Sequence, residues 1–248
     1  MKFLKITSLT IAMLTLLSIV VTTTSTVHAA ENVISIDNSV SDNPNTIMGL
    51  KLDIIEQNNL IEFDDSEDID IQNLSQNQKN FILQVATKST EQIDGIETVE
   101  QQAVAAEYIL GVFDSNSDYY QNPLKAQSEM QNRLKEEFGI QILPNLNSML
   151  KSHGLLSVGV LGAIINTGLS VITGGSISAY VKKKGWNALV NALQSRLMTT
   201  LKFKQLGKII GGLSGTIMKI LDPGTFIAEQ IDNSRFDKIR GNGWIELW

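Results

Sequence analysis

The side chains that most often carry catalysis are scarce in this 248-residue chain. It has two histidines and no cysteine, so disulfides, thiolate metal sites and cysteine nucleophiles are excluded. His28 lies in a segment that we expect to be removed, and His153 precedes an apolar stretch, where a helix-end or surface position is the ordinary role of a lone histidine. Zinc-protease, serine-hydrolase, Walker A and EF-hand motifs are missing from the sequence. We therefore expect no catalytic residue, no cofactor and no metal, and a protein that is not an enzyme.

The densest group of acids is at residues 62–70, EFDDSEDID, with six acids in nine residues. The segment lacks the glycine turn and terminal glutamate of a dedicated calcium loop, so we predict no specific calcium site. Two interpretations stay open. The segment is a solvated linker, or it is an acidic pro-segment that screens a cationic part of the chain until export is complete.

Charge is sorted along the chain. Residues 31–80 carry a net charge of −9, residues 81–150 carry −6, and residues 151–248 carry +7. An acidic front and a cationic rear indicate a function that uses the asymmetry. Because the rear lysines alternate with long apolar segments in a chain that we expect to be exported, we predict no nucleic-acid partner.

Lysines and tryptophans meet at the ends of apolar segments in the rear half. This placement suits the headgroup boundary of a membrane, where each lysine near an anionic surface contributes about 1 kcal/mol. The tail tryptophans have a second interpretation, as a clamp that closes the helical core. The predicted membrane-binding residues are Lys182, Lys183, Lys184, Trp186, Lys202, Lys204, Lys208, Trp244 and Trp248.

Between Leu155 and Val181 there are 27 consecutive residues without a formal charge. Gly159 with Ala163, and Ser170 with Gly174, form small-xxx-small pairs that let helices approach closely. Gly174 and Gly175 predict a bend or break. Three interpretations remain open: a buried helical hairpin in a soluble protein, a segment that is soluble at first and enters a membrane later, and a permanent transmembrane anchor.

The remaining pattern predicts an all-α protein, with amphipathic N-terminal helices followed by a glycine-rich apolar helical bundle, and no segment before residue 150 shows strand alternation of any length. One expected helix, 97–113, has an inward stripe made of Val99, Ala103, Ala106, Ile109 and Leu110. Pro123 suits a helix start and Gly139 a helix stop. The other expected helices are 46–58, one opened by Ser75, 123–138, 186–201, 209–220 and 225–231, and the expected turns are 114–118, 222–224 and 241–243.

The first residues read as a secretory signal peptide. Lys2 and Lys5 precede an apolar run, and Val27 and Ala29 supply small residues for cleavage after Ala29. An uncleaved anchor helix is the alternative. We therefore predict a secreted protein, of Gram-positive type, with a signal peptide at 1–29, an acidic and partly disordered pro-segment or linker at 30–75, an amphipathic helical region at 76–150, and a cationic glycine-rich helical domain at 151–248.

The segment 175–186, GSISAYVKKKGW, is similar to secreted bacteriocins of Gram-positive bacteria, in particular the helical, circular enterocin type. The terminal Trp248 agrees with this resemblance. It implies a compact helical bundle that binds anionic envelopes through its lysines and then permeabilises them. More than a hundred residues precede the apolar region here, whereas circular precursors have short leaders, so release of a C-terminal part by proteolysis is the closer analogy.

The expected function is that of a bacteriocin-like or pore-forming membrane-active toxin, with antimicrobial action. Its expected partners are anionic membrane lipid or the bacterial envelope and a maturation protease, with oligomers forming on the membrane. Two alternatives stay open: a soluble secreted helical domain that binds a cell-surface protein, and an immunity protein that resides in the producer's membrane.

Overall fold

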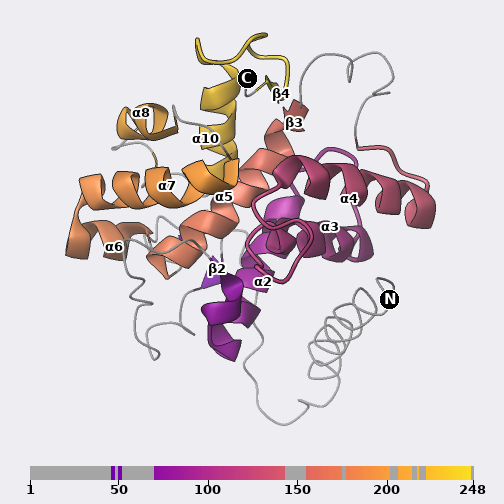
Figure 1. Cartoon of the computed structure of the whole chain (residues 1–248), viewed down its shortest axis with the longest axis horizontal. Coiled ribbons are helices and arrows are strands. Elements are labelled where there is room, and N and C mark those ends of the chain that lie inside the picture. Colours follow the sequence, from indigo (N-terminus) through magenta and orange to yellow (C-terminus); the bar gives the residue numbers. More distant parts are fainter. Residues whose placement is uncertain are drawn as a thin grey trace. The chain divides into compact units, whose positions relative to one another are not determined.

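The computed structural model describes residues 46–47, 50–51, 70–142, 155–174, 177–201, 206–213, 217 and 222–246. All of them belong to one compact unit, residues 41–248. The predicted signal peptide, most of the acidic segment and His153 lie outside the described residues. The structure confirms the predicted all-α class, since helices make up most of its elements (Figure 1).

The helix predicted over 46–58 is wrong in its described part. Residues 46–47 and 50–51 form a two-stranded antiparallel hairpin, β1 (Thr46–Ile47) and β2 (Leu50–Lys51), in which Thr46 faces Lys51. Apolar residues three apart fit one helical face, and they fit the two arms of a short hairpin equally well, so their spacing alone did not separate the two structures.

Local capping signals mark the helix starts of the front half, and the helix predicted over 97–113 is shorter than expected, running from Val99 to Gly111. After a 3-10 turn, η2 (Ile71–Asn73), α2 (Gln76–Thr90) begins behind Ser75 and α3 (Val99–Gly111) behind Thr98, each with a complete capping box. Helix α4 (Pro123–Phe138) has its proline in the first turn and ends at Gly139, whose φ of 70° is the left-handed conformation that glycine adopts easily.

The inward stripe predicted for α3 is wrong at its first position, and its second residue, Ala103, is only partly buried. Val99 is 66% exposed, whereas Val104 and Ala105 are buried. Val99 is the first helical residue after the Thr98 cap. In this position the side chain lies at the rim of the domain, before the helix has reached the core.

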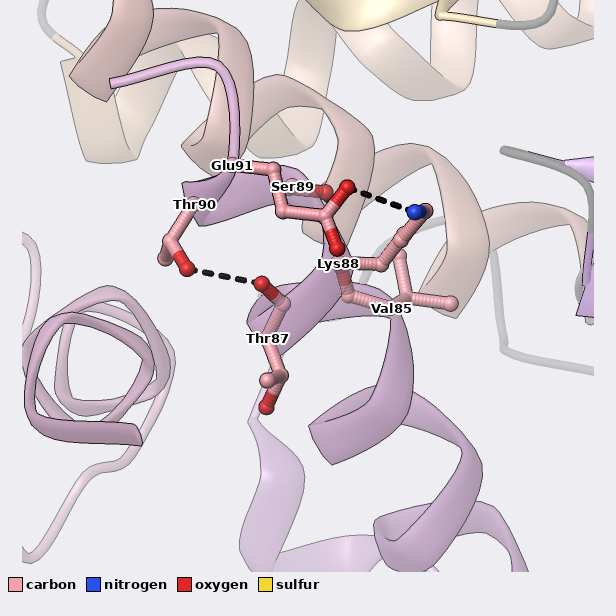
Figure 2. Close-up of polar contacts among 6 residues, drawn as sticks. All are labelled: Val85, Thr87, Lys88, Ser89, Thr90 and Glu91. Atoms are coloured by element: carbon pink, nitrogen blue, oxygen red, sulfur yellow. Dashed lines mark hydrogen bonds and ion pairs between the residues drawn. The ribbon is translucent and has the colours of Figure 1, made fainter. Parts of the chain in front are cut away.

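Polar contacts close the C-terminal turn of α2 (Figure 2). The hydroxyl of Ser89 donates to the carbonyl of Val85, the hydroxyl of Thr90 donates to the carbonyl of Thr87, and Lys88 forms an ion pair with Glu91. Ser89 and Thr90 are fully buried, so these bonds satisfy hydroxyls that burial would otherwise leave without a partner. The turn leads directly into residues 92–93, which contact the rear half.

The rear half is organised around α5 (Val158–Thr173). This helix packs against α2 and α3 from the front half and against α6 (Ile177–Lys184), α7 (Trp186–Leu201) and α10 (Pro223–Asp232) from the rear (Figure 1). The contacts of α5 with α2 and α3 cross the boundary expected at residue 150. The predicted extent of α7 is confirmed, and its leucines at 189, 193, 197 and 201 are all buried.

Two elements of the rear half differ from the prediction. Helix α8 (Leu206–Gly211) starts before residue 209 and ends at Gly211, with a turn at 212–213, so the helix predicted over 209–220 is not continuous. Adjacent glycines give the chain the freedom to leave the helix there. Residues 222–224 start α10 rather than forming a separate turn, because Asp222 caps that helix and Pro223 occupies its first position.

A short antiparallel ladder joins the two ends of the rear half. Strand β3 (Leu155–Ser157) directly precedes α5, and it pairs with β4 (Trp244–Glu246), so that Leu156 faces Ile245. Both of these residues are buried. The predicted turn at 241–243 is confirmed, with positive φ at Gly241 and Gly243.

Candidate functional site

Helix α5 is the most completely enclosed element that the structure describes. Every residue from Val160 to Thr173 is buried. Ser157 caps its N-terminus, and Gly174, with a φ of 61°, ends it. The hydroxyl of Thr167 donates to the carbonyl of Ala163 at 2.9 Å. That of Thr173 donates within the same helix, to Leu169, at 2.8 Å. These two hydroxyls therefore need no partner from outside the helix.

One polar side chain of α5 depends on another helix. The amide nitrogen of Asn166 donates to Oδ1 of Asp222 at 2.7 Å, and its amide oxygen accepts from the backbone N–H of Gly224 at 2.7 Å. The same Asp222 oxygen accepts from Thr225 and caps α10. Asn166 is fully buried, so α10 supplies the hydrogen bonds that this amide requires in the interior.

Glycines allow the backbones of α5 and α10 to come into contact where the two helices cross. A Cβ added to Gly224 would lie 2.3 Å from the carbonyl oxygen of Gly162, and a Cβ added to Gly162 would lie 2.8 Å from Cα of Thr225. Both distances are shorter than real Cβ contacts allow, so the two backbones touch only because neither residue has a side chain. Together with Asn166, these glycines fix where α10 sits on α5.

The predicted helix-packing residues are all in or at the end of α5. A Cβ on Gly159 would lie 2.7 Å from the carbonyl oxygen of Gln92, so the absence of a side chain at Gly159 lets the turn after α2 pack directly against α5. Ala163 is buried, Ser170 is buried with a hydroxyl that lacks a partner among the described residues, and Gly174 ends the helix. Gly168, which the prediction omitted, receives Leu197 of α7.

Within the described ranges, no single helix has both the length and the apolar character that crossing a membrane needs. By length and composition alone, Val158–Thr173 and Ile177–Lys184 meet both requirements only as a pair, and the pair is bent by 48°. Helix α5 ends at Gly174, where the sequence predicted a bend or break.

The lysine triplet predicted to bind lipid is at the C-terminal end of α6. Lys182, Lys183 and Lys184 are all exposed, and Nζ of Lys184 lies 5.6 Å from the centre of the Tyr180 ring. Gly185, with a φ of 88°, turns the chain directly into α7. Cations in the last turn of a helix are favoured by its dipole, so the triplet suits the end of α6 and places three exposed cations within one helical turn.

The other predicted membrane-binding residues are dispersed. Trp186 opens α7 half-buried, and its indole N–H is enclosed without an acceptor among the described residues. Lys208 is exposed on α8, which packs on α7, and Trp244 is half-buried in β4. Lys202, Lys204 and Trp248 lie outside the described residues.

A group of buried carboxylates in the C-terminal region was missed in the sequence. Asp232, Asp237 and Glu246 are between 5% and 7% exposed. Burial, together with the neighbouring charge of Glu246, raises the pKa of Asp237 to about 6, against the lowering effect of backbone N–H donors. The acids are spaced irregularly in the sequence, five and nine residues apart, so no periodic pattern marked them as inward-facing.

Comparison with protein-family models, with curated proteins and with solved structures finds no match for this chain.

Proposed function

We propose that this chain is a secreted, membrane-active protein of the bacteriocin-like or pore-forming type. It keeps an apolar helix inside a folded helical domain and delivers that helix to an anionic membrane. The single observation that carries the proposal is the segment 158–184. It joins a charge-free helix, buried from Val160 to Thr173, to an exposed triplet of lysines.

The triplet would act first, by attracting the protein to anionic lipid. Each cation near such a surface contributes about 1 kcal/mol, so three lysines together contribute about 3 kcal/mol, or roughly a hundredfold in binding. Trp186 follows the triplet by two residues and has an amphipathic ring suited to the headgroup level.

Entry of α5 into lipid would follow. Most of its buried surface is apolar and would exchange contact with protein for contact with lipid, and Thr167 and Thr173 keep their bonds inside the helix. The 16 residues of α5 span roughly 24 Å, less than the ~30 Å of a bilayer core. Helix α5 must therefore straighten with α6, thin the bilayer locally, or associate with other copies.

The elements packed on α5 would have to leave it before it reaches lipid, α2 and α3 among them. Helix α10 holds it through Asn166 and the glycine crossing, α7 through Leu197 at Gly168, and the turn after α2 through Gly159. We propose in addition that the acidic front of the chain screens the cationic rear until a maturation protease releases it as a pro-segment.

The test is binding to vesicles of phosphatidylglycerol and phosphatidylcholine at a 1:3 ratio. The exported form of the chain, residues 30–248, is compared with a variant in which Lys182, Lys183 and Lys184 are all replaced by Gln. We expect about a hundredfold weaker binding, since about 3 kcal/mol is lost.

The matched control removes the same charge from the front half, through Lys79→Gln, Lys125→Gln and Lys135→Gln. Its effect on binding should be much smaller, because these lysines lie on α2 and α4, away from α6 in the sequence. Equal binding by the lysine-triplet variant and the unchanged chain would remove the electrostatic part of the proposal. A folded chain that neither binds nor permeabilises vesicles would favour a soluble domain with a protein partner.

A further inference from the structure

The segment between α10 and β4, residues 233–243, sorts its charges by side. Three cations on it are exposed to solvent: Arg235, Lys238 and Arg240. The acids that bracket it or lie within it face inward. No ion pair joins the three cations to an acid in the part of the chain that the structure describes. The three cations are therefore exposed to solvent without an ion-pair partner among the described residues.

The inward carboxylates hold the segment in shape through backbone N–H groups. Asp232 accepts from the N–H groups of Asn242 and Gly243, at 3.3 and 3.1 Å. Asp237 accepts from those of Lys238 and Glu246, at 2.8 and 3.0 Å. Hydrogen bonds between carboxylates and N–H groups are stronger than those between neutral groups. They fix the backbone of the loop, and with it the positions from which its cations extend.

One apolar side chain is fixed among the cations. Ile239 is 54% exposed, and its N–H donates to Oε2 of Glu246 at 2.9 Å. Among the described residues, Val99 is the other large apolar side chain with comparable exposure. The exposed surface around Ile239 therefore combines positive charge with an apolar side chain, as segments that bind at a membrane interface do.

The loop is also tied to the start of α5. The N–H of Val158, the first residue of that helix, donates to the carbonyl of Gly243 at 3.0 Å, and β4 pairs with β3. The lysine triplet lies at the other end of the segment 158–184. Each end of the apolar segment therefore adjoins a group of exposed cations.

We propose that residues 235–240 form a second lipid-contact surface, which binds the phosphate groups of anionic lipids through Arg235, Lys238 and Arg240 and places Ile239 among the headgroups. Charge complementarity identifies the occupant: three exposed cations, without an ion pair among the described residues, fit a phosphate surface, and arginine binds phosphate oxygens in a two-pronged geometry. This inference rests on the proposed function, and it assigns a lipid partner to a surface that is separate from the lysine triplet.

The test uses the absence of cysteine in the chain. Ile239→Cys in residues 30–248 gives a single site for an environment-sensitive NBD label, and Val99→Cys gives a matched control on an exposed apolar residue of the front half. With vesicles of phosphatidylglycerol and phosphatidylcholine at 1:3, we expect a blue shift and loss of iodide quenching at position 239. We expect neither change at position 99, nor at either position with phosphatidylcholine alone.

A charge variant supplies the second measurement. The combination Arg235→Gln, Lys238→Gln and Arg240→Gln should weaken binding to the same anionic vesicles about a hundredfold. The front-half triple at positions 79, 125 and 135 is the matched control.

The outcomes separate the two proposals. Equal loss of binding in the loop variant and in the front-half control variant overturns the loop as a specific surface. The same label response at positions 239 and 99 does so as well. No response at 239 while the unlabelled chain still releases dye from anionic vesicles overturns the loop and leaves the proposed function standing. A folded chain that neither binds nor releases dye overturns the proposed function and the loop with it.

Discussion

Replacing Asn166 with leucine tests how α5 is held in the domain. The change removes the bond to Asp222, which involves a charged acceptor, and leaves the buried N–H of Gly224 without its partner. The first loss costs about 1.5–3 kcal/mol and the second about 1–3 kcal/mol. Burial of the leucine side chain offsets about 1–2 kcal/mol of this. We expect the free energy of unfolding to fall by about 2–4 kcal/mol, measured by urea unfolding.

The same substitution should make the protein more active on membranes. If α10 must leave α5 before insertion, weakening their contact raises the population of the open form, by at least about tenfold for 2 kcal/mol. The assay is the rate of dye release from anionic vesicles. Thr167→Val is the matched control, because Thr167 is equally buried in α5 but bonds only within the helix. A destabilised Asn166→Leu variant that releases dye no faster than the control would refute α10 as a cover of α5.

Three further predictions concern stability, each measured by chemical unfolding. The pKa of Asp237 is raised to about 6 in the folded chain, so protonated Asp237 stabilises the fold at low pH, and this contribution is lost as the pH rises through 6. The free energy of unfolding of the unchanged chain should therefore fall by about 1–3 kcal/mol between pH 4 and pH 7, relative to that of Asp237→Asn. Parallel pH profiles of the two proteins would contradict the shared environment of Asp237 and Glu246. The exposed cations beside it, on residues 235, 238 and 240, lie in both proteins and cancel in this difference. Gly162→Ala should cost about 1–3 kcal/mol because its Cβ meets Thr225, with an unchanged midpoint counting against the close crossing. Ser75→Ala should cost about 1 kcal/mol through loss of the α2 cap, and a loss below 0.3 kcal/mol would indicate that the capping box contributes little.

Local signals were sufficient where a helix end is determined by its own residues. Ser75 located the start of α2, and Pro123 and Gly139 located the two ends of α4, because caps, first-turn prolines and left-handed glycines act over one turn. The four-residue leucine spacing located α7 for a similar reason, since a helix must bury one continuous stripe.

The sequence was insufficient where the outcome depends on a distant segment. The pairing of β3 with β4 joins Leu156 to Ile245, residues 89 positions apart, and three-residue strands carry no periodic pattern of their own. The close approach of Gly162 and Gly224 is likewise a property of two helices meeting. The glycines of α5 suggested close packing, but the partner of each became visible only in the fold.

The inward carboxylates of the C-terminal region illustrate the same limit for the candidate site. Charged side chains are ordinarily exposed, and Arg235, Lys238 and Arg240 follow this rule. Asp237 and Glu246 are buried instead, because the chain turns at 241–243 and brings backbone N–H groups to them. A carboxylate that accepts several N–H bonds can be buried at acceptable cost, which composition alone does not reveal.

Release of a trapped dye from vesicles tests the central claim most directly. Residues 30–248 are added to vesicles of phosphatidylglycerol and phosphatidylcholine at 1:3 and, in parallel, to vesicles of phosphatidylcholine alone. The proposed function predicts release from the anionic vesicles, suppressed by high salt, and little release from the zwitterionic ones. A folded, monomeric chain that releases dye from neither would contradict it.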